Sequence, residues 1–283
     1  MMIHIKHLLF YWILLLMLLS CTDDEKESNL VYPKTGFQKI ELSETIRDEI
    51  TVTSTQTYIY GKNGRLTAFS GLQTPDGKEW EIRNTTLVEY AGYQATIADD
   101  AGNVSAYILD DEGYAVECTR TEGGGRFRYY TFSYFVTATG KHYLKEITET
   151  LEKGAAPCAR INIDYTDTNQ FVVTQWVRDD SWSFKMSFPD INGTANVSEI
   201  PCVGLAETYP LSLHSAALYG KLLGDTYDVL VSKIEPVVSG EGQEGDTDTY
   251  SYTTDSRGVV TSCSIVTNCC GCNYYRTIDY VIE

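Results

Sequence analysis

Alternation of apolar and polar residues recurs along most of the chain after its first forty residues. In residues 182–188 every second side chain is large and apolar, and Ile161 and Ile163 are separated by a polar residue in the same way. Successive side chains of a strand point to opposite faces, so a period of two predicts strands with one buried face. Turn sequences such as Asn63-Gly64 separate these runs and supply the left-handed residues of tight hairpins.

These runs predict an antiparallel meander. About fifteen segments have the strand pattern, and strongly twisted open sheets rarely exceed about ten strands. We therefore expect an all-β, many-stranded and strongly curved antiparallel sheet that closes into a barrel or folds into two layers. Residues 211–224 are the exception, because Leu211, Leu218 and Leu222 have helical spacing. We expect one short helix there, packed over an end or side of the sheet.

The N-terminus carries a different pattern. Residues 8–19 are twelve consecutive apolar residues that follow Lys6. Such a run is shorter than the roughly 20 residues of a spanning helix and fits the core of a signal peptide. It ends in Leu-Leu-Ser-Cys at residues 18–21, which resembles the bacterial lipoprotein box, in which the cysteine is lipidated and becomes the new N-terminus. We therefore expect residues 1–20 to be a signal peptide and Cys21 to be lipidated. An ordinary secretory signal with a chance cysteine is the alternative.

An acidic stretch follows this cysteine at residues 22–27. It resembles the export tag of surface-exposed lipoproteins of some anaerobic Gram-negative gut bacteria, although a solvated tether has the same composition. We expect residues 21–36 to be a lipidated acidic tether and residues 37–283 to be one β-rich domain. The expected location is the outer membrane, reached through the N-terminal lipid, with the domain on the cell surface or, alternatively, facing the periplasm.

Charge excludes one class of partner. The chain has 283 residues with 22 Lys+Arg and 39 Asp+Glu, a formal net charge of −17. Nucleic-acid binding needs clustered Lys and Arg, so we expect no nucleic-acid partner. The same balance disfavours electrostatic docking on anionic lipid.

Eight cysteines raise the question of disulfides or metal. Cys21 is assigned to the lipid, and four others crowd near the C-terminus: Cys263, Cys269, Cys270 and Cys272. An oxidising compartment favours a disulfide-stitched turn between two strands. A zinc site is the alternative, supported by the C-x-x-C spacing of Cys269 and Cys272 but lacking a second, separate pair.

Catalytic motifs are missing from the sequence. It has no G-x-S-x-G, H-E-x-x-H, P-loop or dinucleotide fingerprint. After the signal region only His142 and His214 remain as candidate bases, and the pairs of Asp residues lie beside turns, where Asp is favoured structurally. Residues 239–248 include four acidic residues, Glu241, Glu244, Asp246 and Asp248. This segment is either a loop that binds calcium or a loop that is simply solvated. We assign no catalytic residue and no cofactor, and expect a protein that is not an enzyme.

Twenty-one tyrosines need an explanation. Aromatic faces stack on sugar rings, and they also pack across strands in any β-rich protein. The candidates for sugar stacking are Tyr129, Tyr130, Tyr134, Trp176 and Trp182.

Several of these features together resemble one family. Aromatic-x-aromatic hairpins such as Tyr58 to Leu66, the return Gly64-Arg65-Leu66 and the segment 217–224 accompany the lipoprotein box. The chain resembles a family of uncharacterised Gram-negative lipoproteins, described as a domain of unknown function with a porin-like fold. The resemblance implies a strongly curved antiparallel sheet and lends no activity and no site residues.

These observations lead to one expected function and two alternatives. We expect a lipid-anchored extracytoplasmic module that binds an unknown ligand on the outer membrane. A glycan-binding or glycan-processing surface lipoprotein is the second reading, and a structural envelope component with a protein partner is the third.

Overall fold

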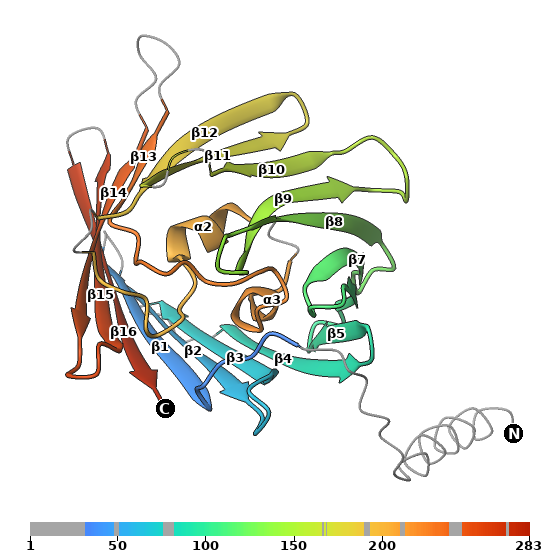
Figure 1. Ribbon diagram of the computed structural model, residues 1–283, viewed down its shortest axis with the longest axis horizontal. Coiled ribbons are helices and arrows are strands. Elements are labelled where there is room, and N and C mark those ends of the chain that lie inside the picture. The colour runs from blue at the N-terminus through green and yellow to red at the C-terminus, as the bar shows by residue number, and fades with distance from the viewer. Residues whose placement is uncertain are drawn as a thin grey trace, which may run out of the picture. The chain divides into compact units, whose positions relative to one another are not determined.

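Sixteen antiparallel strands close into a barrel in the computed structural model (Figure 1), which describes residues 32–47, 51–75, 82–165, 167, 169–189, 193–209, 213–237, 245–269 and 272–283. The strands are β1 (Lys39–Arg47), β2 (Val52–Tyr60), β3 (Leu66–Pro75), β4 (Ile82–Ala91), β5 (Gln94–Asp99), β6 (Val104–Leu109), β7 (Ala115–Thr121), β8 (Phe127–Val136), β9 (His142–Thr150), β10 (Ala159–Asp164), β11 (Gln170–Val177), β12 (Asp180–Ser187), β13 (Lys233–Pro236), β14 (Thr247–Thr254), β15 (Val260–Cys269) and β16 (Cys272–Ile282). Each strand pairs with its neighbours in sequence, and β1 pairs with β16 to close the ring. The expected curved meander is thus confirmed as a closed barrel.

The long connection between β12 and β13 runs through the barrel. We call residues 193–209 and 213–232 of this connection the plug; it carries two short helices, α2 (Val203–Thr208) and α3 (Ser215–Tyr219). Both helices lie in the middle of the ring of strands (Figure 1). The helix expected within residues 211–224 is therefore present as α3, but it lies inside the ring of strands and not over an end or side of the sheet. The helix α2 was not expected. With six residues and only Leu205 buried, α2 has too little apolar surface to produce a helical pattern.

The interior of the barrel is apolar and aromatic. Along β6 the burial alternates strictly, with Ser105, Tyr107 and Leu109 turned inward. Tyr58, Tyr107 and Tyr130 are among the largest fully buried side chains, so these tyrosines serve packing. Fully burying an aliphatic side chain stabilises the fold by about 1.5–3 kcal/mol. The plug supplies the surface against which the inward-facing side chains of the barrel are buried.

The outer face of the barrel is mostly polar. Outward positions alternate with the buried ones along each strand, and Lys185 of β12 pairs there with Glu235 of β13 at 2.7 Å. Other outward positions carry Glu41, Ser43, Thr45, Thr55, Thr57, Glu117, Thr119, Arg160, Asn162, Ser183, Ser264 and Thr277. Among the described helices, none is long and apolar enough to cross a membrane.

The barrel has two different ends. Turns that follow even-numbered strands lie at one end together with both ends of the plug, and we call this end the N-terminal rim. Residues from Tyr32 to Gln38 lie along it: the Thr35 amide donates to the carbonyl of Gly64 at 3.0 Å, and the Lys221 ammonium donates to the carbonyl of Lys34 at 3.1 Å. Turns that follow odd-numbered strands form the opposite end, which we call the mouth.

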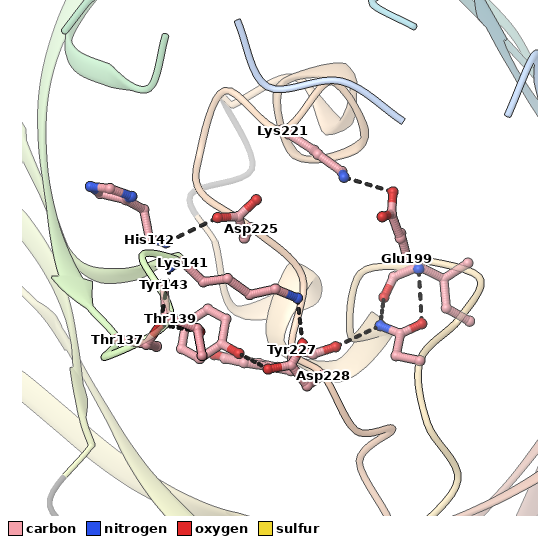
Figure 2. Close-up of polar contacts among 12 residues, drawn as sticks. Thr137, Thr139, Lys141, His142, Tyr143, Glu199, Lys221, Asp225, Tyr227 and Asp228 are labelled. Carbon is pink, nitrogen blue, oxygen red and sulfur yellow. Dashed lines mark hydrogen bonds and ion pairs between the residues drawn. The ribbon is translucent and has the colours of Figure 1, made fainter. Parts of the chain in front are cut away.

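Polar contacts fasten the plug near the N-terminal rim (Figure 2). Asp225 accepts hydrogen bonds from the Tyr114 hydroxyl at 2.8 Å and from the backbone amide of His142 at 3.0 Å. Asp228 pairs with Lys141 and accepts a bond from the Tyr143 hydroxyl at 3.0 Å. The plug is therefore held on the β8–β9 hairpin by charge-assisted bonds, which are stronger than neutral ones.

Candidate binding site at the mouth of the barrel

A cavity of about 250 Å³ lies between the plug and the barrel wall formed by β16, β1 and β2. We call it the first cavity. Its wall includes Leu42, Tyr58 and Ile278, and the plug contributes Ala206 and Leu218 from its two helices. This lining is largely apolar, and the volume is near the lower end of the range for small-molecule sites.

A charged cluster lies at one end of the first cavity. Arg276 Nη1 is 2.5 Å from Glu207 Oε1, and its Nε contacts Glu44. The side chain of Glu207 is 53% exposed, whereas those of Arg276 and Glu44 are 22% and 13% exposed. Burial alone would lower the pKa of Arg276, but attraction by the two carboxylates raises it above its ordinary value. One guanidinium between two carboxylates leaves one negative charge unmatched, so this end of the cavity favours hydroxyl or ammonium donors.

Two stacked tyrosines form the inner wall of the first cavity. The rings of Tyr58 and Tyr219 are 3.7 Å apart between centroids, with 15° between their planes. The Tyr58 hydroxyl donates to Gln56 Oε1 at 2.9 Å, and burial raises the pKa of Tyr58 well above its ordinary value. The hydroxyl therefore remains protonated and keeps the Gln56 amide in place beside the cavity.

A second cavity of about 480 Å³ adjoins the first. It lies against β4, β5 and β7 and is lined by Asn84, Thr86 and Arg120 among others. His214 and Ser215 line both cavities, so the start of α3 separates them.

His214 is fixed by a buried hydrogen-bond network. Its Nε2 is 3.0 Å from Asp99 Oδ2, and its Nδ1 is 3.1 Å from the hydroxyl of Ser105. Asp99 also accepts bonds from the backbone amide and the side chain of Asn103, at 2.8 and 2.7 Å. Because the carboxylate only accepts, the network assigns the ring proton to Nε2 and makes Nδ1 the acceptor for Ser105.

The electrostatics keep this histidine neutral. Burial lowers the pKa of His214, and the nearby Arg120 lowers it further, so the raising effect of Asp99 is outweighed. For Asp99, burial would raise the pKa, but hydrogen bonds from Asn103 and His214 lower it below its ordinary value. At neutral pH the pair is therefore an ionised Asp99 and a neutral His214.

The order Asp99–His214–Ser105 is that of a catalytic triad. However, Ser105 has 0% exposure, and the Arg120 guanidinium lies 3.4 Å from its oxygen. A fully enclosed hydroxyl has no access to an acyl substrate, so this network positions His214 and Arg120 rather than supplying a nucleophile.

The cysteines singled out in the sequence occupy different environments. Cys21 and Cys270 lie outside the described residues. Cys263 is a buried free thiol whose pKa burial raises to about 12. Cys272 is an exposed free thiol at the end of the β15–β16 hairpin, in register with Cys269. The expected disulfide or zinc site near the C-terminus remains a prediction, and within the described ranges no three His, Cys, Asp or Glu side chains are grouped to hold a metal ion.

Of the remaining candidate residues, some pack inside the barrel or against the plug and others are exposed. His142 stacks on Tyr114 and pairs with Glu112 at 2.7 Å, on the N-terminal rim. Tyr134 donates to the carbonyl of Leu222 at 3.1 Å and so holds the plug, while Tyr130 is fully buried and Tyr129 is partly buried. Trp176 and Trp182, on the hairpin of β11 and β12 at the mouth, are 38% and 47% exposed.

Solved structures with the same fold are porin-like proteins. One from Bacteroides uniformis is 43% identical, covers 89% of this chain and 99% of its own, and has a TM-score of 0.81. One from Bacteroides vulgatus is 14% identical, covers 87% of this chain and 98% of its own, and has a TM-score of 0.54, which supports the fold alone. None of the functionally curated proteins matches the chain.

A family model assigns the chain. The model for a domain of unknown function (DUF4595) with porin-like fold matches residues 43–262, which include most strands of the barrel and the whole plug. The resemblance noted from the hairpins and the segment 217–224 is thereby confirmed, and the chain belongs to the DUF4595 family of porin-like domains.

Proposed function

We propose that this protein is a lipid-anchored binding protein of the outer membrane that takes a small ligand, or the end of a larger one, into the first cavity. The observation that carries the proposal is an apolar cavity of about 250 Å³ with the Arg276 cluster at its open end. Apolar walls with a few convergent polar groups are the usual construction of a ligand site. The apolar run of residues 8–19 followed by the lipoprotein box that ends at Cys21 supports the anchor, which is the lipid on Cys21.

The direction of the chain supports this arrangement. The charged end of the first cavity is the end nearer the mouth. Arg276 lies in the first half of β16, which begins at the mouth, and Glu44 lies in the second half of β1, which ends there. We expect a ligand to enter the cavity from this end.

A glycan is the second candidate ligand, favoured by one observation. Trp176 and Trp182 remain exposed at the mouth, where aromatic faces with polar neighbours are suited to sugar rings. Trp182 lies in register with Gln175 on the neighbouring strand, which adds an amide beside the ring. A neutral glycan would place its terminal sugar against the Glu44, Arg276 and Glu207 cluster.

Filling the first cavity tests its role as a ligand site. Ala206→Trp introduces an indole from α2 into the cavity, and Ala106→Trp places the same side chain on the outer face of β6 as a control. After dialysis against a small-molecule extract that includes oligosaccharides, native mass spectrometry should find a ligand on the wild type and on A106W, with at least tenfold lower occupancy on A206W. Equal occupancy of all three proteins would contradict the proposal.

Replacing the lipidation cysteine tests the anchor. Cys21→Ser should abolish labelling with radioactive palmitate and move the protein from the membrane fraction to the soluble fraction, because several acyl chains together hold a domain durably. Protease treatment of intact cells then distinguishes surface display from a periplasm-facing domain. Labelling that persists in the Cys21→Ser protein would refute the anchor.

A further inference from the structure

The second cavity contains a buried cation that lacks a carboxylate partner. Arg120, on β7, is 7% exposed and lines this cavity. Its Nη1 lies 3.4 Å from the Ser105 hydroxyl and 3.1 and 3.3 Å from the two ring nitrogens of His214, all of which are uncharged groups. In the described part of the chain, its Nε has no hydrogen-bond partner, and no ion pair includes Arg120.

Nearby carboxylates are already used by other groups. Glu122 pairs with Arg126 and Arg128, and Glu149 pairs with Arg128 at 2.5 Å. Asp99 is held by His214 and Asn103. Asp100 also lines the cavity, where it accepts the backbone amide of Thr85 at 3.0 Å, and in the described part of the chain no ion pair joins it or Asp99 to Arg120. An unpaired buried charge is destabilising relative to a paired one. The fold therefore keeps the Arg120 guanidinium beside the cavity without a direct carboxylate partner.

We propose that the second cavity binds the carboxylate group of a small organic acid, with Arg120 as the recognition residue. The planar guanidinium forms charge-assisted hydrogen bonds with a carboxylate, and Arg120 borders this cavity without an ion pair in the described part of the chain. Asn84, Thr86 and Ser215 add amide and hydroxyl donors around the same space. Asp99 and Asp100 also line the cavity, so it suits one negative charge better than the two of a phosphate.

This proposal stands apart from the ligand of the first cavity, because the start of α3 separates the two spaces. Binding at Arg120 can therefore succeed or fail whatever occupies the first cavity, and the Ala206→Trp protein provides the check. That variant should bind carboxylates as the wild type does.

The test compares acids with their neutral amides. The affinities of acetate, acetamide, benzoate, benzamide and inorganic phosphate are measured by isothermal titration calorimetry. Acetate and benzoate should each bind at least tenfold more tightly than the corresponding amide, and phosphate should bind more weakly than either acid. Arg120→Gln should remove this preference. Arg128→Gln is the matched control, because Arg128 lies directly opposite Arg120 on β8 but is already paired with two glutamates; it should keep the preference.

Folding of the variants is monitored by circular dichroism. Should Arg120→Gln fail to fold, Asn84→Trp narrows the cavity from an exposed position and should lower acetate affinity at least fivefold. The proposal is overturned if the wild type binds acids and amides equally, if Arg120→Gln keeps the preference, or if phosphate binds more tightly than acetate.

Discussion

Gly224→Ala is expected to lower the free energy of unfolding by about 3–5 kcal/mol and to loosen the plug from the barrel wall. Gly224 has φ +103°, a conformation that residues with a Cβ rarely adopt, and an added Cβ would lie 2.7 Å from the carbonyl oxygen of His142 and 3.1 Å from the amide nitrogen of Leu144. Both neighbours are backbone atoms of β9, so neither can move aside as a side-chain tip would. The strained φ accounts for about 1–3 kcal/mol, and the displaced backbone for the rest.

The position of Gly224 extends this loss to the fastening of the plug. The backbone amide of the next residue, Asp225, donates a hydrogen bond to the carbonyl of His142 at 2.7 Å, and the Asp225 carboxylate accepts one from the Tyr114 hydroxyl at 2.8 Å. A shift at Gly224 moves both bonds, and the segment shown in Figure 2 also carries Tyr227 and Asp228. Because α3 precedes this segment directly, the walls of both cavities should become less well defined.

Gly140→Ala is the control for the Gly224 substitution. Gly140 also has a positive φ, +83°, but an added Cβ there meets nothing within 4 Å. Urea denaturation should therefore show a loss of only about 1–2 kcal/mol for Gly140→Ala, and the difference between the two variants measures the contact with β9. Equal losses in the two variants would show that Gly224 is not a close-contact point for the plug.

The alternation of residues was sufficient to predict a strongly curved antiparallel sheet, with a barrel as one of its two expected forms, but not the plug. On β16, Ile278, Tyr280 and Ile282 share the inner face. This period of two is a property of the strand itself and can be recognised without knowing which distant residues the strand contacts. The plug has no such period, and some of its contacts are with residues more than sixty positions away in the sequence, such as those of Tyr227 with Tyr165 and of Lys221 with Lys34. A segment stabilised by distant partners leaves little local pattern to read.

The sequence carries a weak signal for the candidate site. Arg276 lies on the apolar face of β16, and Arg120 lies on the same face of β7 as the buried Cys118. A charge on an otherwise buried face indicates a buried partner or a binding site. The sequence could not identify the partners, since Glu44, Glu207, Asp99 and His214 come from four separate elements that only the closed barrel brings together.

Arg276→Met is expected to cost about 2–4 kcal/mol of stability, because it leaves Glu44 as an unpaired carboxylate in a mostly buried place. Ser54 would still donate to Glu44 Oε2 at 3.2 Å, but one neutral hydrogen bond does not replace a guanidinium. Glu207 is largely exposed and should contribute little, since water replaces its partner. Thermal and urea unfolding of the variant measure the loss.

A double variant distinguishes the loss of stability caused by an unpaired buried carboxylate from the stability contributed by the ion pair itself. In Arg276→Met/Glu44→Gln no buried carboxylate is left without its partner, because the Glu207 side chain is 53% exposed and is solvated by water. The double variant should therefore regain at least half of the stability lost by Arg276→Met alone. Glu207→Gln is the matched control for removal of a carboxylate and should change stability by less than about 1 kcal/mol. If the double variant is as unstable as the sum of the two single ones, Arg276 and Glu44 do not act as a pair. Ligand occupancy should fall in Arg276→Met and also in the double variant, because both lack the guanidinium at the charged end of the first cavity. The second substitution restores stability but not this charge.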